Sequence, residues 1–300
     1  MTEYHVPVLL HESVEALQIH PDGIYVDVTF GAGGHSRSIV EKLSAKGHLY
    51  ATDQDNDALS NSLNDDRFTL INANFRYLGR FLTWYGATQV DGILADLGVS
   101  SHQFDFPERG FSYRFDAPLD MRMNVESKLT AKEIVARYPE EKLVDIFSRY
   151  GEVRNARQLA RELVRSRQSV QITTTFSFNQ ILSKVCIGQQ WKYFSQVYQA
   201  LRMEVNDEIG ALREMLETGL KFLKKGGRFV VITYHSIEDR EVKNFFKTGN
   251  FEGVQNKDMF GNIRRPFEQV GKNVVVPSDK EQAINPRSRS AKLRIVQKVI

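Results

Sequence analysis

Alternating strand and helix signals in the first hundred residues constrain the fold of this chain most strongly. The strand signals are at 24–28, 48–52, 68–71 and 90–95. Three of these segments end in a polar or glycine-rich element. In open parallel α/β sheets, ligands bind at the carboxyl ends of the strands. The sequence therefore predicts an α/β fold with a ligand site at that edge of the sheet.

The alternation stops after the fourth strand. Residues 104–124 read as a loop rich in aromatic and charged residues, and residues 130–223 read as helices only. The helical stretch opens with the pattern of a capping box at Thr130 and Glu133. An apolar strand at 229–233 then resumes the sheet, and a final strand is expected at 293–299.

This pattern predicts a sheet domain in two parts, residues 1–104 and 206–300. An all-helical domain, residues 105–205, is inserted between them. We find no internal repeat and no low-complexity segment.

Composition bounds the class of protein. Of 300 residues, 41% are hydrophobic and 26% are charged, as in globular proteins. The longest apolar run, 229–232, is far shorter than the roughly 20 residues of a membrane span, and the N-terminus lacks a signal-peptide pattern. The one cysteine, Cys186, excludes an internal disulfide and a cysteine zinc cluster, and we expect it in the core. We expect a cytoplasmic protein that contacts no membrane.

The net charge of +3 gives no argument for or against nucleic-acid binding, but the distribution of the cationic residues does. One cationic set lies in a short stretch without acidic residues, and a second set recurs at helical spacing. The sets are Arg287, Arg289, Lys292 and Arg294, and Arg154, Arg157, Arg161, Arg165 and Arg167. We assign the first set to phosphate contact, with a solvated tail as the alternative, and read the second as a solvated helix face.

The loop after the first strand, 27–36, has the chemistry of an anion-binding turn. Its glycines allow a ligand to approach the backbone, and free N–H groups at the start of the next helix favour a phosphate or a carboxylate. The glycine spacing lacks the third glycine of a dinucleotide fingerprint. A purely structural tight turn remains an alternative.

Asp53 ends the second strand, about twenty residues after this loop. A carboxylate there accepts the two hydroxyl hydrogen bonds of a ribose, which NAD and S-adenosylmethionine share. Phe75 and Asp96, at the ends of the next two strands, are placed to flank an adenine and to face a methionine amino group. A solvated acid in a turn is the alternative for Asp53.

Asp96 also opens the segment in which a transfer reaction is expected. An exocyclic amine is a weak nucleophile, and acceptors that hold its hydrogens can turn it toward an electrophilic methyl group. We choose Asp96 for that role. An N-cap or a ribose contact is the alternative.

The chain resembles the bacterial 16S rRNA cytidine-N4 methyltransferases over most of its length. Eight ordered motifs carry the resemblance, which makes it far more specific than a glycine loop. They are HVPVLLHE (5–12), DVTFGAGGHS (27–36), DLGVSS (96–101), RGFS with PLDMRM (109–112, 118–123), ALR with VN (200–202, 205–206), GGR (226–228), HSIEDR (235–240) and NPRSRSAKLR (285–294).

The resemblance implies a class I, Rossmann-like methyltransferase sheet with a helical insert, and an enzyme that uses S-adenosyl-L-methionine. It implies methylation of a cytidine N4 in the decoding region of small-subunit rRNA, within an assembled or nearly assembled subunit, by a monomer or a homodimer. It also implies a set of cofactor-binding residues: Gly33, Gly34, His35, Asp53, Phe75, Asp96 and Gln103.

Four positions depart from the family pattern. Tyr234 stands where Phe is usual, His102 where Pro is usual, Ala117 where Gly is usual, and Val153 where a second Glu is usual. None of them is a proposed cofactor ligand, so they bear on loop conformation rather than on the reaction.

The remaining motifs supply further candidates for the site. We expect His235, at a strand end, to point into the pocket beside a capping box at Ser236–Asp239, and Asn206 to orient the target base or only to aid packing. Arg109, Phe111 and Arg122 lie in a loop suited to hold a flipped base, although a packed Ω-loop is the alternative. We identify no metal-ligand cluster.

Three rival functions are weighed against this one. A nicotinamide-dependent dehydrogenase needs the full glycine fingerprint and an acid/base partner, and neither is found. A DNA amino methyltransferase needs a Pro-Pro-aromatic motif after the position of Asp96, where this chain has Leu97-Gly98-Val99. A non-catalytic RNA-binding or ribosome-assembly protein would share the fold and differ in cofactor binding.

Overall fold

The computed structural model describes residues 7–100, 103–104, 106–255, 259 and 265–300. The chain forms two compact units, the first from Met1–Gly98 with Ile209–Ile300 and the second from Val99–Glu208. From the sequence we expected the insert at 105–205. Of the residues singled out above, His5, Val6, Ser101 and His102 lie outside the described ones.

Within the described ranges, the first unit contains a seven-stranded sheet in the order β3-β2-β1-β4-β5-β7-β6. Its strands are β1 (Ile24–Asp27), β2 (His48–Asp53), β3 (Phe68–Asn72), β4 (Val90–Asp96), β5 (Leu223–Thr233), β6 (Phe267–Gln269) and β7 (Lys292–Lys298). β1 to β5 run parallel, and β7 is antiparallel to both β5 and β6. From β1 the strands are added outward on one side, through β2 to β3, and from β4 they are added on the other side. Ligands bind at such a switch point, here between β1 and β4.

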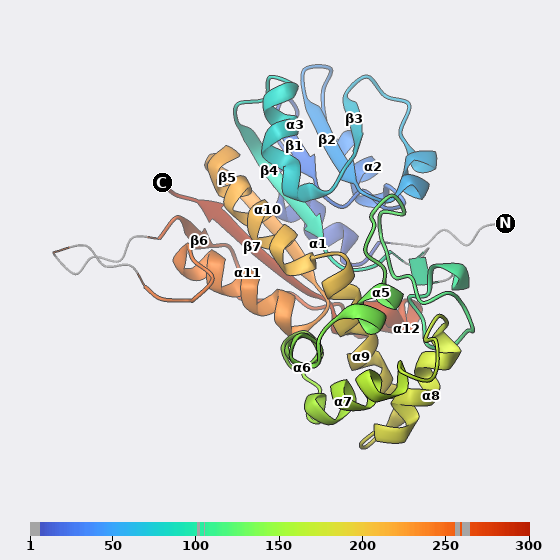
Figure 1. The fold of residues 1–300 in the computed structure, drawn as a ribbon. Helices are drawn as coiled ribbons and strands as arrows, with labels where there is room; N and C mark the ends of the chain where they lie inside the picture. The colour runs from blue at the N-terminus through green and yellow to red at the C-terminus, as the bar shows by residue number, and fades with distance from the viewer. Residues whose placement is uncertain (1–6, 101–102, 105, 256–258, 260–264) are drawn as a thin grey trace. The chain divides into compact units, whose positions relative to one another are not determined.

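Helices cover both faces of this sheet (Figure 1). Residues of α1 (Leu10–Ala16) and α2 (Gly34–Val40) share a buried apolar cluster with Val230 and Ile232 of β5. Phe229 points to the other face, where its ring centroid lies 5.4 Å from that of Phe246 in α11 (Ser236–Thr248). α10 (Glu208–Phe222) packs on the same face, and α3 (Leu78–Trp84) packs against α10.

A close approach fixes α10 on the sheet. A Cβ atom at Gly219 would lie 2.4 Å from the Phe229 ring, so only glycine fits there. The central strand β4 is buried almost throughout, as expected for a parallel strand covered on both faces.

The predicted α/β fold is confirmed, and the first four strands end within about a residue of their predicted positions. Two details were wrong. β5 begins at Leu223 rather than at 229, because Leu223 pairs with Val90 ahead of a bulge. β6 was not predicted, because its three residues are too short to show a pattern.

The second unit is helical, as predicted. Its helices are α5 (Ala131–Arg137), α6 (Glu140–Arg149), α7 (Ala156–Ser166), α8 (Thr175–Val185) and α9 (Gln190–Val205), and a short 3-10 turn, η3 (Pro107–Arg109), precedes them. The capping box of Thr130 and Glu133 is present. Cys186 is half-buried against the core of this unit, and burial raises the pKa of its thiol.

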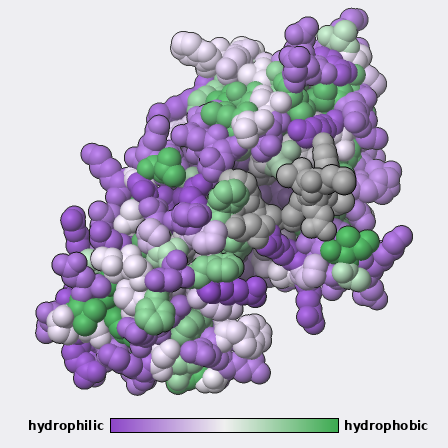
Figure 2. All heavy atoms as spheres, turned by 90° about the vertical axis from the view of Figure 1, so that its right-hand side faces the viewer, coloured by the Kyte–Doolittle hydropathy of each residue, from purple (hydrophilic) through white to green (hydrophobic). Residues whose placement is uncertain are grey.

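The described helices include none that is both long and apolar enough to span a bilayer. On the face drawn in Figure 2, apolar side chains form small groups separated by hydrophilic ones.

Candidate cofactor and catalytic site

The glycine loop between β1 and α2 has a backbone that only glycine adopts easily. Gly31 and Gly33 have φ angles of 53° and 77°, in the left-handed region. A Cβ atom at Gly33 would lie 2.7 Å from the Phe30 ring, and one at Gly34 would lie 2.2 Å from Cγ of Pro7. The loop therefore requires glycine at 33 and 34 on steric grounds, before any ligand is considered.

Side chains tie this loop to the ends of three neighbouring strands. The Ser36 hydroxyl donates to the buried Asp27 carboxylate at 2.7 Å. The Asp96 backbone N–H donates to Oγ1 of Thr29 at 2.6 Å, which links the loop to the end of β4. The Gly31 N–H donates to Oδ2 of Asp53 at 2.8 Å, which links it to the end of β2. The sequence motif 27–36 is thus a preorganised turn at the switch point of the sheet.

Asp53 has the hydrogen-bond acceptors that the hydroxyls of a ribose require. Its Oδ1 accepts the Asp55 N–H at 2.9 Å while Oδ2 accepts that of Gly31, and each carboxylate oxygen keeps a second lone pair. Burial raises the pKa of Asp53 to about 6, although these two backbone N–H groups act to lower it. At neutral pH the group is ionised and can accept two hydroxyl hydrogen bonds.

Asp96 lies at the end of β4, with its side chain 22% exposed. The Tyr234 hydroxyl donates to Oδ1 at 2.7 Å, and Nδ1 of His35 lies 3.9 Å from Oδ2. Burial raises the pKa of Asp96 to about 6, against the lowering effects of His35 and Tyr234. Asp96 is therefore an acceptor that titrates just below neutral pH, as a group that exchanges a proton with an amine needs to.

His35 is the second residue of α2 and is only 5% exposed. Burial lowers the pKa of its imidazole, so the ring is neutral at neutral pH. Within the described part of the chain, its Nε2 atom is buried without a hydrogen-bond partner. A backbone hydrogen bond to Val8 opposes this effect of burial on the pKa of the ring.

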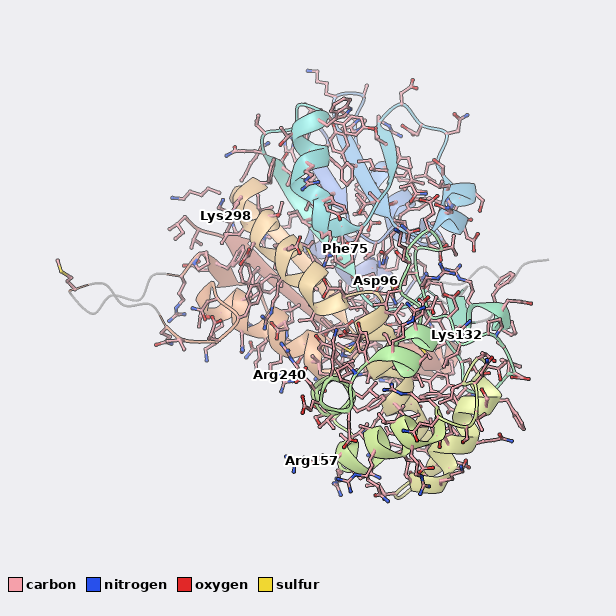
Figure 3. All side chains as sticks on the ribbon, viewed as in Figure 1. Phe75, Asp96, Lys132, Arg157, Arg240 and Lys298 are labelled. Atoms are coloured by element: carbon pink, nitrogen blue, oxygen red, sulfur yellow. The ribbon has the colours of Figure 1, made fainter. Side chains whose placement is uncertain are left out.

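Phe75 starts a 3-10 turn, η2 (Phe75–Tyr77), just after β3, and is half-buried. Figure 3 labels it together with Asp96. Because β3 and β4 belong to the parallel part of the sheet, their carboxyl ends face the same edge. The first unit thus brings Gly33, Gly34, His35, Asp53, Phe75 and Asp96 to one edge of one sheet.

His235 has a different local role from the predicted one. It is itself the N-cap of α11, with Nδ1 accepting the Glu238 N–H at 3.4 Å, so the prediction that Ser236 caps this helix was wrong by one residue. Its Nε2 lies 3.0 Å from Oε1 of Glu238. Its catalytic role stays a prediction.

Two predicted site residues of the second unit, Gln103 and Asn206, form hydrogen bonds within that unit. Gln103 is buried, with its Oε1 accepting the Ser100 N–H at 3.2 Å. Asn206 accepts the Met123 N–H at 2.8 Å and donates to the Met121 carbonyl at 2.8 Å, so its amide braces the 109–123 loop.

That loop is packed in the way the Ω-loop alternative describes. Arg109 donates to the carbonyls of Arg122 and Met123, and Arg122 pairs with Asp120 at 2.7 Å. Phe111 is 5% exposed within the apolar core of the unit. Contact of Arg109, Phe111 and Arg122 with a substrate base stays a prediction.

The two cationic sets divide into exposed and buried members. Arg287 and Arg289 are exposed on η4 (Pro286–Ser290), whereas Arg294 is 8% exposed and holds Asp239 through bonds of 2.7 and 3.1 Å. Nζ of Lys292 also lies close to this acid, 3.4 Å from Oδ2 of Asp239. Within the first set, the prediction of phosphate contact therefore applies to Arg287 and Arg289.

In the second set, Arg157, Arg161 and Arg165 are exposed along α7, and Arg154 is exposed just before it. Arg167, just after α7, is half-buried and donates to the carbonyls of Val135 and Tyr138, so the prediction of a solvated face was wrong for this residue. Arg157 is labelled in Figure 3. Arg161 and Arg165 approach Glu140 and Glu162 at 3.8 and 2.6 Å, so part of this charge is balanced.

Sequence reasoning missed Tyr234 as part of the site. It was noted only as a departure at a strand end, and its contact with Asp96 spans 138 positions of sequence. A hydroxyl added to a usual phenylalanine position was the available signal.

Comparisons with known proteins identify the family of this chain. A family model described as the MraW methylase family matches residues 2–299. A protein of Parabacteroides distasonis named ribosomal RNA small subunit methyltransferase H is 56% identical, over 99% of this chain and 98% of its own. A protein of the same name from Flavobacterium johnsoniae is 55% identical, over 99% and 98%. A solved rRNA methylase of Streptococcus thermophilus superposes over 99% of both chains with a TM-score of 0.45 at 13% identity, too distant to carry an argument.

Proposed function

The chain belongs to the MraW methylase family, and from that premise we propose that it methylates the exocyclic N4 of a cytidine in small-subunit ribosomal RNA. It is an S-adenosylmethionine-dependent methyltransferase. Relatives that match it over nearly their full length are named for the small-subunit RNA. The choice of cytidine N4 in the decoding region follows the eight sequence motifs and the acceptor chemistry of Asp96.

One observation carries the proposal: a single loop joins the carboxyl ends of β1, β2 and β4. The Gly31 N–H holds Asp53, and Thr29 holds the backbone of Asp96. Asp53, which we assign to the ribose, and Asp96, which we assign to the substrate amine, are thereby held in one rigid framework. Catalysis by positioning needs such a framework, because misplacement by about an ångström is costly.

The residues of this edge fit S-adenosylmethionine. The Asp53 carboxylate accepts the ribose hydroxyls, Phe75 flanks the adenine, and the backbone at Gly33 and Gly34 allows close approach. His35 lies beside the same edge, with its Nδ1 3.9 Å from Oδ2 of Asp96. The bound cofactor supplies an electrophilic methyl group.

Asp96 orients the nucleophile. The lone pair of a cytidine amine is delocalised into the ring, and a carboxylate oxygen that accepts one N–H hydrogen bond turns the nitrogen toward the methyl group. Ionised Asp96, with its pKa of about 6, can then accept the proton that the methylated nitrogen loses.

Exposed arginines support contact with RNA. Arg287 and Arg289 on η4 and the arginines of α7 present cations to solvent, and phosphate contacts dominate the affinity of most proteins for nucleic acid. We propose that the substrate is an assembled or nearly assembled small subunit rather than free RNA, bound by a monomer or a homodimer.

The test is transfer of a tritiated methyl group to small subunits from cells that lack the gene, with free rRNA as a parallel substrate. We expect incorporation of label by the wild type and a loss of at least about 100-fold for Asp96→Ala, the scale of removing one transition-state hydrogen-bonding group. Asp66→Ala, an exposed acid before β3, is the matched control and should keep full activity.

Near-normal transfer by Asp96→Ala would refute the role of Asp96. Absence of S-adenosylmethionine binding at millimolar concentration by the folded wild type would instead favour the non-catalytic assembly protein.

A further inference from the structure

Tyr234 lies between the end of β5 and the start of α11 and is partly buried against the core of the first unit. Its hydroxyl donates to Oδ1 of Asp96 at 2.7 Å. The ring is packed as well as bonded, because a Cβ atom at Gly98 would lie 3.4 Å from it.

Asp96 is restrained from three directions. Its backbone N–H donates to Thr29, its Oδ1 accepts the hydroxyl of Tyr234, and its Oδ2 lies 3.9 Å from Nδ1 of His35. The hydrogen bond to Oδ1 restricts rotation of the carboxylate. It thereby also restricts the directions in which Oδ2 presents its lone pairs.

The charges around Asp96 come from several elements. His35 of α2, Tyr234 after β5, Asp27 of β1 and Glu238 of α11 all act on it, and the two acids oppose its ionisation. The Tyr234 hydrogen bond favours the ionised form. Burial raises the pKa of Tyr234 far above its usual range, so its hydroxyl remains a donor at every working pH.

We propose that Tyr234 is a positioning residue for methyl transfer, whose hydroxyl group holds the Asp96 carboxylate ionised and aimed at the substrate amine. The inference rests on the proposed function, because it assigns Tyr234 a task only if Asp96 orients the amine. The hydroxyl acts through Asp96 and touches neither substrate nor cofactor in this role.

The experiment compares wild type, Tyr234→Phe and Tyr25→Phe in the tritiated-methyl assay, with kcat and KM for each substrate measured from pH 5.5 to 9. Tyr25 is the matched control: it is a buried tyrosine of the same sheet whose hydroxyl accepts the His20 N–H at 2.7 Å. Its strand position is near the amino end of β1, away from the edge that carries Asp96.

For Tyr234→Phe we expect kcat to fall about tenfold near pH 6.5, the scale of one hydrogen bond to a charged group, with little change in KM for S-adenosylmethionine. The acid limb of the kcat profile should move to higher pH, because Asp96 loses a hydrogen bond that favours its ionised form. The deficit should therefore shrink toward pH 9. Tyr25→Phe should change thermal stability without moving the profile.

A Tyr234→Phe enzyme that is folded and has the wild-type kcat and pH profile would overturn the inference. So would a uniform loss of activity with an unmoved acid limb, since lost stability alone produces that result. The double variant Asp96→Ala/Tyr234→Phe should be no worse than Asp96→Ala; additive losses would contradict action through Asp96. If Asp96→Ala itself stays active, the proposed function of Asp96 fails first, which separates the two failures.

Discussion

Replacing Asp53 by asparagine separates the stability of the fold from cofactor binding. The substitution keeps the shape of the side chain but removes its charge. One acceptor oxygen becomes an NH2 group, which must face the N–H of either Gly31 or Asp55. The same substitution removes an acceptor that the ribose hydroxyls require.

The effect on stability depends on pH in a predictable direction. Burial raises the pKa of Asp53 from 3.8 to about 6, which corresponds to about 3 kcal/mol of disfavoured ionisation. Between about pH 4 and 6 the folded protein keeps a proton that the unfolded chain releases. This carboxyl therefore stabilises the fold at low pH, and the contribution is lost as pH rises through 6. Asparagine does not titrate.

We thus expect the free energy of unfolding of the wild type, relative to Asp53→Asn, to fall by up to about 3 kcal/mol from pH 4 to pH 7. Urea denaturation of both proteins at several pH values measures it. Titration calorimetry should show S-adenosylmethionine affinity reduced at least about tenfold in the variant, because hydrogen bonds to a charged acceptor are lost. Asp66→Asn serves as the exposed control. Unchanged cofactor affinity, or a stability difference that is independent of pH, would refute the reasoning.

Two further predictions address the loop and the RNA. Gly33→Ala should weaken S-adenosylmethionine binding and cost about 1–3 kcal/mol of stability, because φ is 77° and the new methyl would meet Phe30; wild-type values in calorimetry and melting would exclude this. Arg287→Gln/Arg289→Gln should lower the salt dependence of RNA affinity in filter binding, whereas an identical salt slope would argue for a solvated tail.

Local pattern was enough to predict the sheet but not its edges. Buried strands carry apolar runs, such as 93–95 in β4 and 229–232 in β5, and the resulting α/β alternation is visible in the sequence. The early start of β5 depends on Leu223 pairing with Val90, and β6 exists only because Phe267–Gln269 pairs with β7. Such pairings join segments distant in sequence, so no local pattern shows them.

The candidate site divides in the same way. Gly33, Asp53 and Asp96 were readable because loop glycines and acids at strand ends are local signals. The contact of Tyr234 with Asp96 and the burial of Arg294 against Asp239 depend on tertiary packing across 138 and 55 positions. For His235, the sequence cannot tell whether a side chain caps the helix it precedes or points away from it.

Mass spectrometry of small-subunit rRNA from cells with and without this gene tests the central claim most directly. The account predicts that one methyl group on a cytidine of the decoding region disappears without the gene. It should return with the wild-type gene and stay absent with Asp96→Ala. An unchanged methylation pattern in the cells without the gene would contradict the account.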